Sequence, residues 1–183
     1  MGGSIFTETP NLIIKHISSQ DFCAIRELQR NDLSLKYFGA PLSDEKIASN
    51  FNDLLMDHFN HCGFSISPVF LKSTGEFIGK AGLVHLDFDR SNPDLELGYF
   101  LLPQFWGRKY ASELARALIP LAFELGAPRV YATIDRANVA SCRVSEKLGM
   151  KLEGEREYGT LEDKPLLYYV AYPDWSEPKV GDK

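Results

Sequence analysis

The stretch from Leu95 to Gly126 constrains the fold most, because it has the pattern of a strand, a loop and a helix in immediate succession. Residues 95–102 are apolar or aromatic and precede a proline, which favours a buried strand over a helix of that length. Apolar residues then recur at helical spacing, and Gly126 and Pro128 stand where a helix would end. Pro120 lies inside this predicted helix, where we expect it to kink or break it.

The loop between this strand and this helix has the composition of a phosphate-binding site. It runs from Gln104 to Ala111, and a helix N-terminus offers unpaired N–H groups and the positive end of the helix dipole. Gly107 lets a ligand approach the backbone closely, and Arg108 and Lys109 add positive charge. The alternative is an ordinary strand-to-helix turn with solvated basic side chains.

A second motif begins at Asn138. Asn138, Ser141, Ser145 and Leu148 are spaced so that they share one face of a helix, and Gly149 would end that helix. The alternative is that Asn138 and Ser141 only cap and solvate the helix.

Taken together, the two motifs resemble the GNAT superfamily of acetyl-coenzyme A dependent N-acetyltransferases. The first is a Gln-x-x-Gly loop after an apolar strand, and the second is Asn-x-x-Ser followed by Glu-Lys-Leu-Gly. Their order and spacing are similar to those of the RimJ/RimL-like branch, the ribosomal-protein N-terminal acetyltransferases. The resemblance covers nearly the whole chain. It implies an α+β fold with a central mixed, mostly antiparallel sheet flanked by helices, and a V-shaped opening between strands 95–102 and 130–134.

The resemblance also implies a binding site for acetyl-coenzyme A as co-substrate. Main-chain groups of strand 95–102 would hold the acetyl and pantetheine groups. The loop from Gln104 to Ala111 would hold the diphosphate, and Asn138 would contact the pantetheine. The implied cofactor-binding residues are Phe100, Leu101, Leu102, Gln104, Gly107, Arg108, Lys109, Tyr110, Ala111, Asn138 and Ser141. Lys109 departs from the family pattern, which has Gly or Ala there. A side chain would be tolerated if the φ angle at this position is negative.

The catalytic residues suggested by the resemblance are Glu96, Ser141 and Asn138. Glu96 would act as a base through water, although a strand carboxylate can also face solvent or pair with a neighbouring strand. Ser141 would donate to the leaving thiolate. Many family members carry a tyrosine for that purpose seven residues after the asparagine, where this chain has Ser145. An acetyl-cysteine mechanism at Cys142 is disfavoured, because no histidine lies near it in sequence.

The composition indicates one globular domain. The chain has 183 residues, 44% of them hydrophobic, and a net charge of −5, which excludes a basic surface for nucleic acid or membrane. We expect a domain at 5–176, flexible termini at 1–4 and 177–183, a cytoplasmic location, and a monomer or homodimer. The three cysteines have no metal-type spacing, and we expect reduced thiols and no metal. His58, His61 and Cys62 are interpreted as polar residues that close a helix before a glycine.

The remaining elements follow from periodicity and turn residues. Helices are expected at 18–31, 43–63 and from about 137, and strands at 12–17, 64–72, 77–88, 130–134, 151–158 and 166–172. Gly79 and Gly82 suggest a bulge or a close backbone approach within strand 77–88.

The leading hypothesis is therefore acetyl transfer from acetyl-coenzyme A to a primary amine by direct attack. The amine would be a protein N-terminus or a small molecule, and segments 31–63 and 158–166 would shape its site. The alternative is a non-catalytic acyl-coenzyme A sensor or interaction module, supported by Lys109 and by the missing tyrosine. A nucleotide-binding protein is disfavoured, because the chain has no G-x-G-x-x-G and no P-loop motif.

Overall fold

The computed structural model describes residues 4–31, 33, 36–37, 42–157 and 165–178. In this part of the chain, eight strands form one sheet in the order β1-β2-β3-β4-β5-β6-β8-β7. The strands are β1 (Ile5–Glu8), β2 (Leu12–Lys15), β3 (Ile66–Leu71), β4 (Phe77–His85), β5 (Leu95–Leu101), β6 (Val130–Ile134), β7 (Lys151–Glu157) and β8 (Pro165–Ala171). Among these pairs, β5 and β6 run parallel and the others antiparallel. This confirms the predicted mixed, mostly antiparallel sheet.

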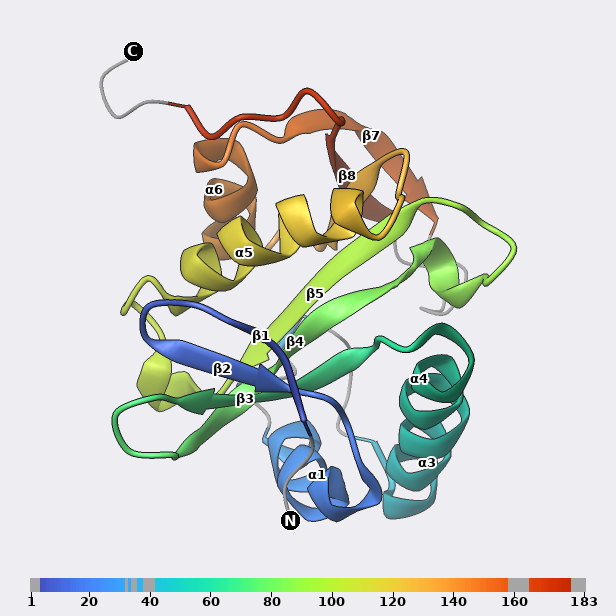
Figure 1. The fold of residues 1–183 in the computed structure, drawn as a ribbon, viewed down its shortest axis with the longest axis vertical. Helices are drawn as coiled ribbons and strands as arrows, with labels where there is room; N and C mark the ends of the chain where they lie inside the picture. Colours follow the sequence, from blue (N-terminus) through green and yellow to red (C-terminus); the bar gives the residue numbers. More distant parts are fainter. Residues whose placement is uncertain (1–3, 32, 34–35, 38–41, 158–164, 179–183) are drawn as a thin grey trace.

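The helices cover the two faces of the sheet. They are α1 (Phe22–Arg30), α3 (Asp44–Ser49), the π-helical η2 (Asn50–Met56), α4 (Asp57–Cys62), α5 (Tyr110–Glu124) and α6 (Val139–Lys147). Figure 1 shows α5 and α6 beside strands β5 to β8, and α1, α3 and α4 grouped at the other end of the molecule. Each group of helices buries its own set of strand side chains.

The faces differ in which strand residues they present. On the first face, Leu83 and Leu97 lie in the main core with Leu114 and Leu118 of α5. On the opposite face, Val84 packs with a second cluster that includes residues of α1 and η2. Because neighbouring strand residues point to opposite faces, these clusters fix the faces of the residues of β5 and of β4 beyond Gly79.

The sheet opens between β5 and β6. The two strands pair at Leu95 with Val130 and at Glu96 with Tyr131, and within the described residues no later pair joins them. β5 meanwhile stays paired with β4 along its whole length, from Leu95 to Leu101. The implied V-shaped opening is therefore present, and it begins beyond Glu96 of β5.

Three local features differ from the sequence-based expectations. Residues 5–8 form a strand, which was not predicted, and the helix at 43–63 contains a π-helical stretch. Pro120 lies within α5 without ending it, so a break at that position is wrong. The predicted bulge in β4 is confirmed, because the register with β3 shifts beside Gly79.

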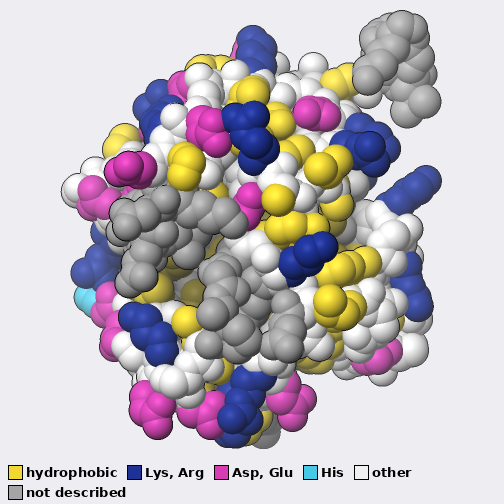
Figure 2. Space-filling model, turned by 180° about the vertical axis from the view of Figure 1, so that it is seen from behind, with side chains coloured by type: hydrophobic (Ala, Val, Ile, Leu, Met, Phe, Trp, Pro, Cys, Tyr) yellow, Lys and Arg dark blue, Asp and Glu magenta, His cyan; other side chains and the backbone are white. Residues whose placement is uncertain are grey.

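The surface combines both signs of charge. On the face seen in Figure 2, basic and acidic side chains alternate around the rim, and hydrophobic ones gather nearer the middle. None of the helices in the described part of the chain is long and apolar enough to cross a membrane.

Candidate active site

Past Glu96, the backbone of β5 has no strand partner on the side of the opening within the described residues. In an antiparallel ladder, alternate residues direct their N–H and C=O groups to the same neighbouring strand. The N–H of Leu102 donates to the carbonyl of Ile78 (2.9 Å), so even-numbered residues face β4. The N–H of Leu95 donates to the carbonyl of Arg129 (3.1 Å), so odd-numbered residues face β6. Past Glu96, the groups of residues 97, 99 and 101 therefore point into the opening.

The alternation of backbone directions along β5 changes the set of residues proposed to contact acetyl-coenzyme A through their backbone. Phe100 and Leu102 were expected to hold the acetyl and pantetheine groups, but the backbone groups of Phe100 and the N–H of Leu102 face β4, and the Leu102 carbonyl accepts the Phe105 N–H (2.9 Å). Leu101 keeps the expected orientation, and its carbonyl accepts a hydrogen bond from the Trp106 indole (2.8 Å). Tyr99, which was not predicted, joins it. The sequence could have indicated Tyr99, because the alternation of side chains along this strand also determines which residues direct their backbone groups into the opening.

The N-terminus of α5 forms the second part of the site. The first bond within the helix joins the Glu113 N–H to the Lys109 carbonyl (3.0 Å), so the N–H groups of residues 110–112 have no partner inside the helix. Gly107 has a φ of +73°, and a Cβ there would meet no atom within 4 Å. Arg108 and Lys109 are exposed, as a site for an anion requires. Gln104 is exposed in the preceding short 3₁₀-helix, and Tyr110 and Ala111 are partly buried.

Lys109 adopts a backbone conformation that its side chain disfavours. Its φ is +66°, in the left-handed region, so the condition under which a side chain was expected to be tolerated, a negative φ, is not met. This explains why glycine suits the position, since a Cβ in this region costs about 1 kcal/mol. The turn is held by Glu113, which accepts hydrogen bonds from the Thr9 hydroxyl (2.5 Å) and from the Asn11 backbone (2.8 Å) and side chain (3.0 Å).

The N-terminus of α6 brings two hydroxyl groups together. Asn138 is the N-cap, and its side-chain oxygen accepts a hydrogen bond from the Ser141 N–H (3.2 Å). The cap leaves the Asn138 amide N–H groups available. Burial raises the pKa of Tyr99 to about 12, while the nearby Ser141 side chain acts in the opposite direction. Tyr99 is therefore a neutral hydroxyl donor at physiological pH, in a chain that has Ser145 at the family's tyrosine position.

Glu96 lies on the opposite face of β5 from Tyr99. It is 9% exposed, and it accepts a hydrogen bond from the Thr133 hydroxyl on β6 (2.5 Å). Since Thr133 is paired with Tyr168 of β8, the phenol of Tyr168 belongs to the same face, and burial raises its pKa. The expectation that a strand carboxylate can pair with a neighbouring strand thus holds for Glu96.

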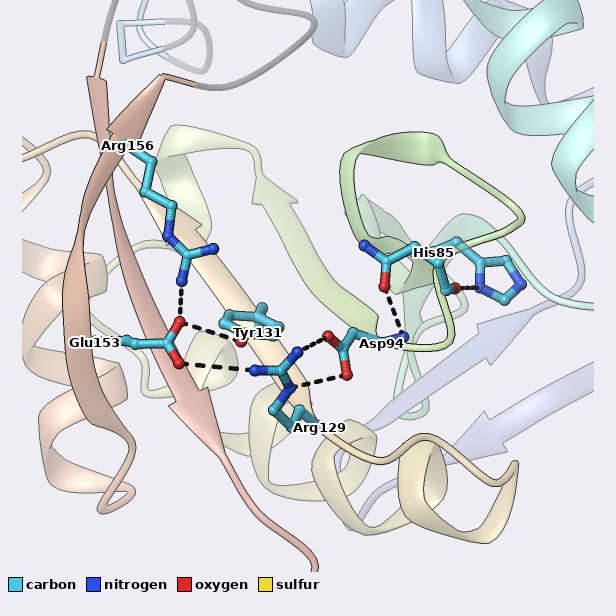
Figure 3. A network of polar contacts seen from close by, with 7 residues as sticks. His85, Asp94, Arg129, Tyr131, Glu153 and Arg156 are labelled. Atoms are coloured by element: carbon cyan, nitrogen blue, oxygen red, sulfur yellow. Dashed lines mark hydrogen bonds and ion pairs between the residues drawn. The ribbon is translucent and has the colours of Figure 1, made fainter.

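An ionic network fixes the closed end of the opening. Arg129, just before β6, forms a two-bond ion pair with the buried Asp94, just before β5 (3.1 and 2.6 Å). Glu153 of β7 accepts from Tyr131 (3.1 Å) and pairs with Arg129 and Arg156 (Figure 3). The network holds β5, β6 and β7 together where the strands still pair, so the strands separate only beyond it.

The cysteines and histidines were also assigned roles from the sequence. Burial raises the pKa of the Cys142 thiol, which argues against a cysteine nucleophile. His85, rather than His61, joins His58 and Cys62 in a cluster whose potential ligand atoms lie within 4.8 Å of one another. In this cluster His58 Nε2 accepts the His85 N–H (3.0 Å), so a metal would have to displace that bond.

Comparisons with known proteins agree with this architecture. A sequence model of the acetyltransferase (GNAT) domain matches residues 11–151. The N-acetyltransferase YoaA of Bacillus subtilis, itself uncharacterized, is 29% identical over 173 residues, which cover 91% of this chain and 96% of YoaA. The crystal structure of an acetyltransferase from Agrobacterium tumefaciens is 26% identical, with a TM-score of 0.76, over 91% of this chain and 93% of that one.

One further neighbour bears on the resemblance to the RimJ/RimL-like branch. RimL, the ribosomal L7/L12 α-N-protein acetyltransferase, is 18% identical with a TM-score of 0.74, over 92% of this chain and 94% of that one. That identity shows a shared fold alone. The family match and the fold together show that the chain belongs to the GNAT family of acetyl-coenzyme A dependent N-acetyltransferases.

Proposed function

We propose that the protein transfers an acetyl group from acetyl-coenzyme A to a primary amine, by direct attack of the amine in a ternary complex. The observation that carries this proposal is the free edge of β5 in the opening, with hydroxyl groups on one face and a carboxylate on the other. A reaction between two substrates needs access to the same atoms from both sides. The opening between β5 and β6 offers that access.

The residues present fit acetyl-coenzyme A as a substrate. The backbone of Tyr99 and Leu101 would pair with the pantetheine arm, much as a further strand would. The unpaired N–H groups of α5, with Gly107, Arg108 and Lys109, would bind the diphosphate. The Asn138 amide would donate to a pantetheine carbonyl. Bound there, the thioester supplies the activated acetyl group.

The chemical roles divide between the faces of β5. Ser141 would donate a hydrogen bond to the departing sulfur, which leaves as the thiolate and takes its proton from water, while the nearby Tyr99 orients the Ser141 hydroxyl. Glu96 would take the proton from the amine, directly or through water. A base matters most for a lysine-like amine, whose reference pKa is about 10.4, and less for a protein N-terminus at about 8.

The acceptor of the proposed reaction belongs to one of two groups, protein N-termini or small-molecule amines. The two sequence motifs resemble those of the RimJ/RimL-like branch, which supports testing N-terminal peptides first. Residues 158–164, predicted to help shape the acceptor site, lie outside the described residues. The oligomeric state, monomer or homodimer, stays a prediction.

The test is release of free thiol from acetyl-coenzyme A in the presence of a panel of amines. Gly107→Glu would place a carboxylate at the diphosphate, and Gly75→Glu is its matched control. The two glycines have φ angles of +73° and +71°, and neither Cβ would meet an atom within 4 Å. We expect Gly107→Glu to lower the affinity for acetyl-coenzyme A at least 10-fold and Gly75→Glu to leave it unchanged. Equal effects of the two substitutions would refute the assigned diphosphate site.

The sensor hypothesis gives a different result in the same assay. Its structural support is the strained Lys109 and the buried serine at position 145, which is 2% exposed and stands where the family's tyrosine would be. A sensor would bind acetyl-coenzyme A in calorimetry and release no thiol with any amine. Turnover that falls together in Tyr99→Phe and Ser141→Ala, with the double variant no worse than either, would support the hydroxyl pair and the transferase.

A further inference from the structure

A lysine is buried in the middle of the sheet, and no carboxylate of the described residues is its partner. Lys80 of β4 is 5% exposed, and its ammonium lies over the ring of Phe100 of β5, 4.6 Å from the ring centre. Among the described residues, no carboxylate lies within ion-pair distance of it. Lysine is almost never fully buried unless it is paired. Burial lowers its pKa to about 8, so most of it is still charged at pH 7.

Lys80 lies on the same face of the sheet as Glu96. The register pairs Lys80 with Phe100, Gly82 with Gly98, and Val84 with Glu96, without a shift between them. Side chains two residues apart on a strand share a face, so Lys80 and Glu96 both point away from α5. This is the face from which the proposed amine reaches the opening.

Lys80 is also close to the segment of β5 that would hold the acetyl group. Its partner Phe100 lies between Tyr99 and Leu101, whose backbone groups face the opening. Neighbouring strands are separated by about 4.8 Å, so the backbone of Lys80 lies roughly one strand spacing behind that edge, and its ammonium reaches the Phe100 ring of β5. An amine placed to attack at the edge would bring its own substituents toward Lys80.

We propose that Lys80 binds an anionic group, a carboxylate or a phosphate, carried by the acceptor a few atoms from its amine. This inference rests on the proposed function and narrows its substrate class. Burial removes the water that would solvate the ammonium, and the Phe100 ring compensates for this loss only in part. A bound anion would supply the remaining stabilisation. Polyamines have no anionic group and would place a second cation against Lys80. The acidic net charge of −5 attracts cations at long range, but contact with Lys80 selects against them.

The test compares amines that differ only in the anionic group. The pairs are glycine with glycinamide, β-alanine with β-alaninamide, and phosphoethanolamine with ethanolamine, with spermidine as a polycation. Thiol release gives kcat/KM, and calorimetry with coenzyme A present gives binding even where turnover is slow. Because paired amines differ in basicity, the preference is compared between the parent and its variants.

The variants are Lys80→Met and Lys80→Gln, with Lys15→Met as the matched control. Lys15 also lies 4.6 Å from the centre of a phenylalanine ring, that of Phe70, but it is only partly buried. Denaturation curves establish that each variant folds. We expect the parent and Lys15→Met to favour the anionic member of at least one pair by about 10- to 100-fold, and both Lys80 variants to lose that preference.

The outcomes separate this inference from the proposed function. If Lys80 prefers one kind of anion, the preference in kcat/KM will differ between the carboxylate pairs and the phosphate pair, and this difference identifies the anion. Equal use of both members of every pair, or a preference that survives in the Lys80 variants, overturns the inference. Failure of every anionic amine to bind also overturns the inference. Acetylation of spermidine alone would overturn it too, but would support the proposed acetyltransferase function. The proposed function fails only if no amine releases thiol.

Discussion

Replacing Lys80 by methionine should stabilise the protein at neutral pH and make its stability less dependent on alkaline pH. Burial lowers the pKa of Lys80 from 10.5 to about 8, because the charged form loses its hydration. The folded state therefore binds this proton less tightly than the unfolded chain does. Methionine has a similar length, fills the same space and carries no charge.

The size of the effect follows from the two pKa values. At about 1.36 kcal/mol per pKa unit, the shift from 10.5 to about 8 corresponds to about 3 kcal/mol of destabilisation when the group is charged in both states. The contact with the Phe100 ring returns about 0.5–2 kcal/mol. The net gain for Lys80→Met at pH 7 is then about 1–3 kcal/mol.

The sign of the pH dependence distinguishes this explanation from a simple packing effect. Below about pH 8 the ammonium is charged in both states and the full cost is present, while above 10.5 it is neutral in both and the cost is gone. The difference in the free energy of unfolding between Lys80→Met and the parent should therefore shrink by about 2–3 kcal/mol from pH 7 to pH 10.5. Burial raises the pKa values of Cys62, Cys142 and Tyr99, which makes stability fall with pH in this range, but these groups are common to both proteins.

The measurement is the free energy of unfolding in urea at several pH values from 6.5 to 10.5, for the parent, Lys80→Met and Lys15→Met. The control removes the same kind of ring contact without removing a fully buried charge. A difference between parent and Lys80→Met that stays constant across this range would refute the reasoning. A parent that is more stable than Lys80→Met at pH 7 would mean that the ammonium has found a partner in the folded protein.

Three further predictions concern the elements around the opening. Lys109→Gly should stabilise the protein by about 0.5–1 kcal/mol in urea denaturation, because its φ of +66° no longer strains a side chain; an unchanged or lower stability would contradict this. Gly79→Ala should cost more than 2 kcal/mol, because its Cβ would lie 2.1 Å from a backbone oxygen of β5. Gly98→Ala, where the Cβ would meet a flexible side chain at 3.1 Å, is the control, and equal costs would rule out the proposed clash. Burial tends to raise the pKa of Glu113, but hydrogen bonds from Thr9 and Asn11 outweigh it and lower the pKa below 4.5. Its contribution is thus present above pH 4.5 and lost as the pH falls through the lower folded value, so Glu113→Gln should cost about 1–2 kcal/mol at pH 7 and less near pH 3 in the same assay. A cost that does not depend on pH would contradict this assignment.

Much of the architecture could be predicted from the sequence, because it depends on local patterns. Strand 130–134 and the helix that begins beyond Asn138 follow from apolar spacing and capping residues. The left-handed backbone at Lys109 could not be predicted, since the loop around it imposes a φ that lysine disfavours. Residues 5–8 are short and form an edge strand through pairing with β2, which local propensity does not reveal. Likewise, Tyr99 meets Ser141 only because the packing of α6 brings residues 42 positions apart into contact.

The division of the candidate site between two sets of residues has one physical cause, the period of two along β5. The side chains of residues 96, 98 and 100 lie on the proposed amine face, and their backbone groups are used by β4. The side chains of residues 97, 99 and 101 lie toward α5, and their backbone groups face the opening. One strand thereby assigns the proposed base to one side and the proposed thioester contacts to the other, with no residue serving both. A shift of register by one residue would exchange the two sets completely. The ion pair of Asp94 with Arg129, at the closed end where β5 begins, therefore helps to hold the register on which this division of the proposed site depends.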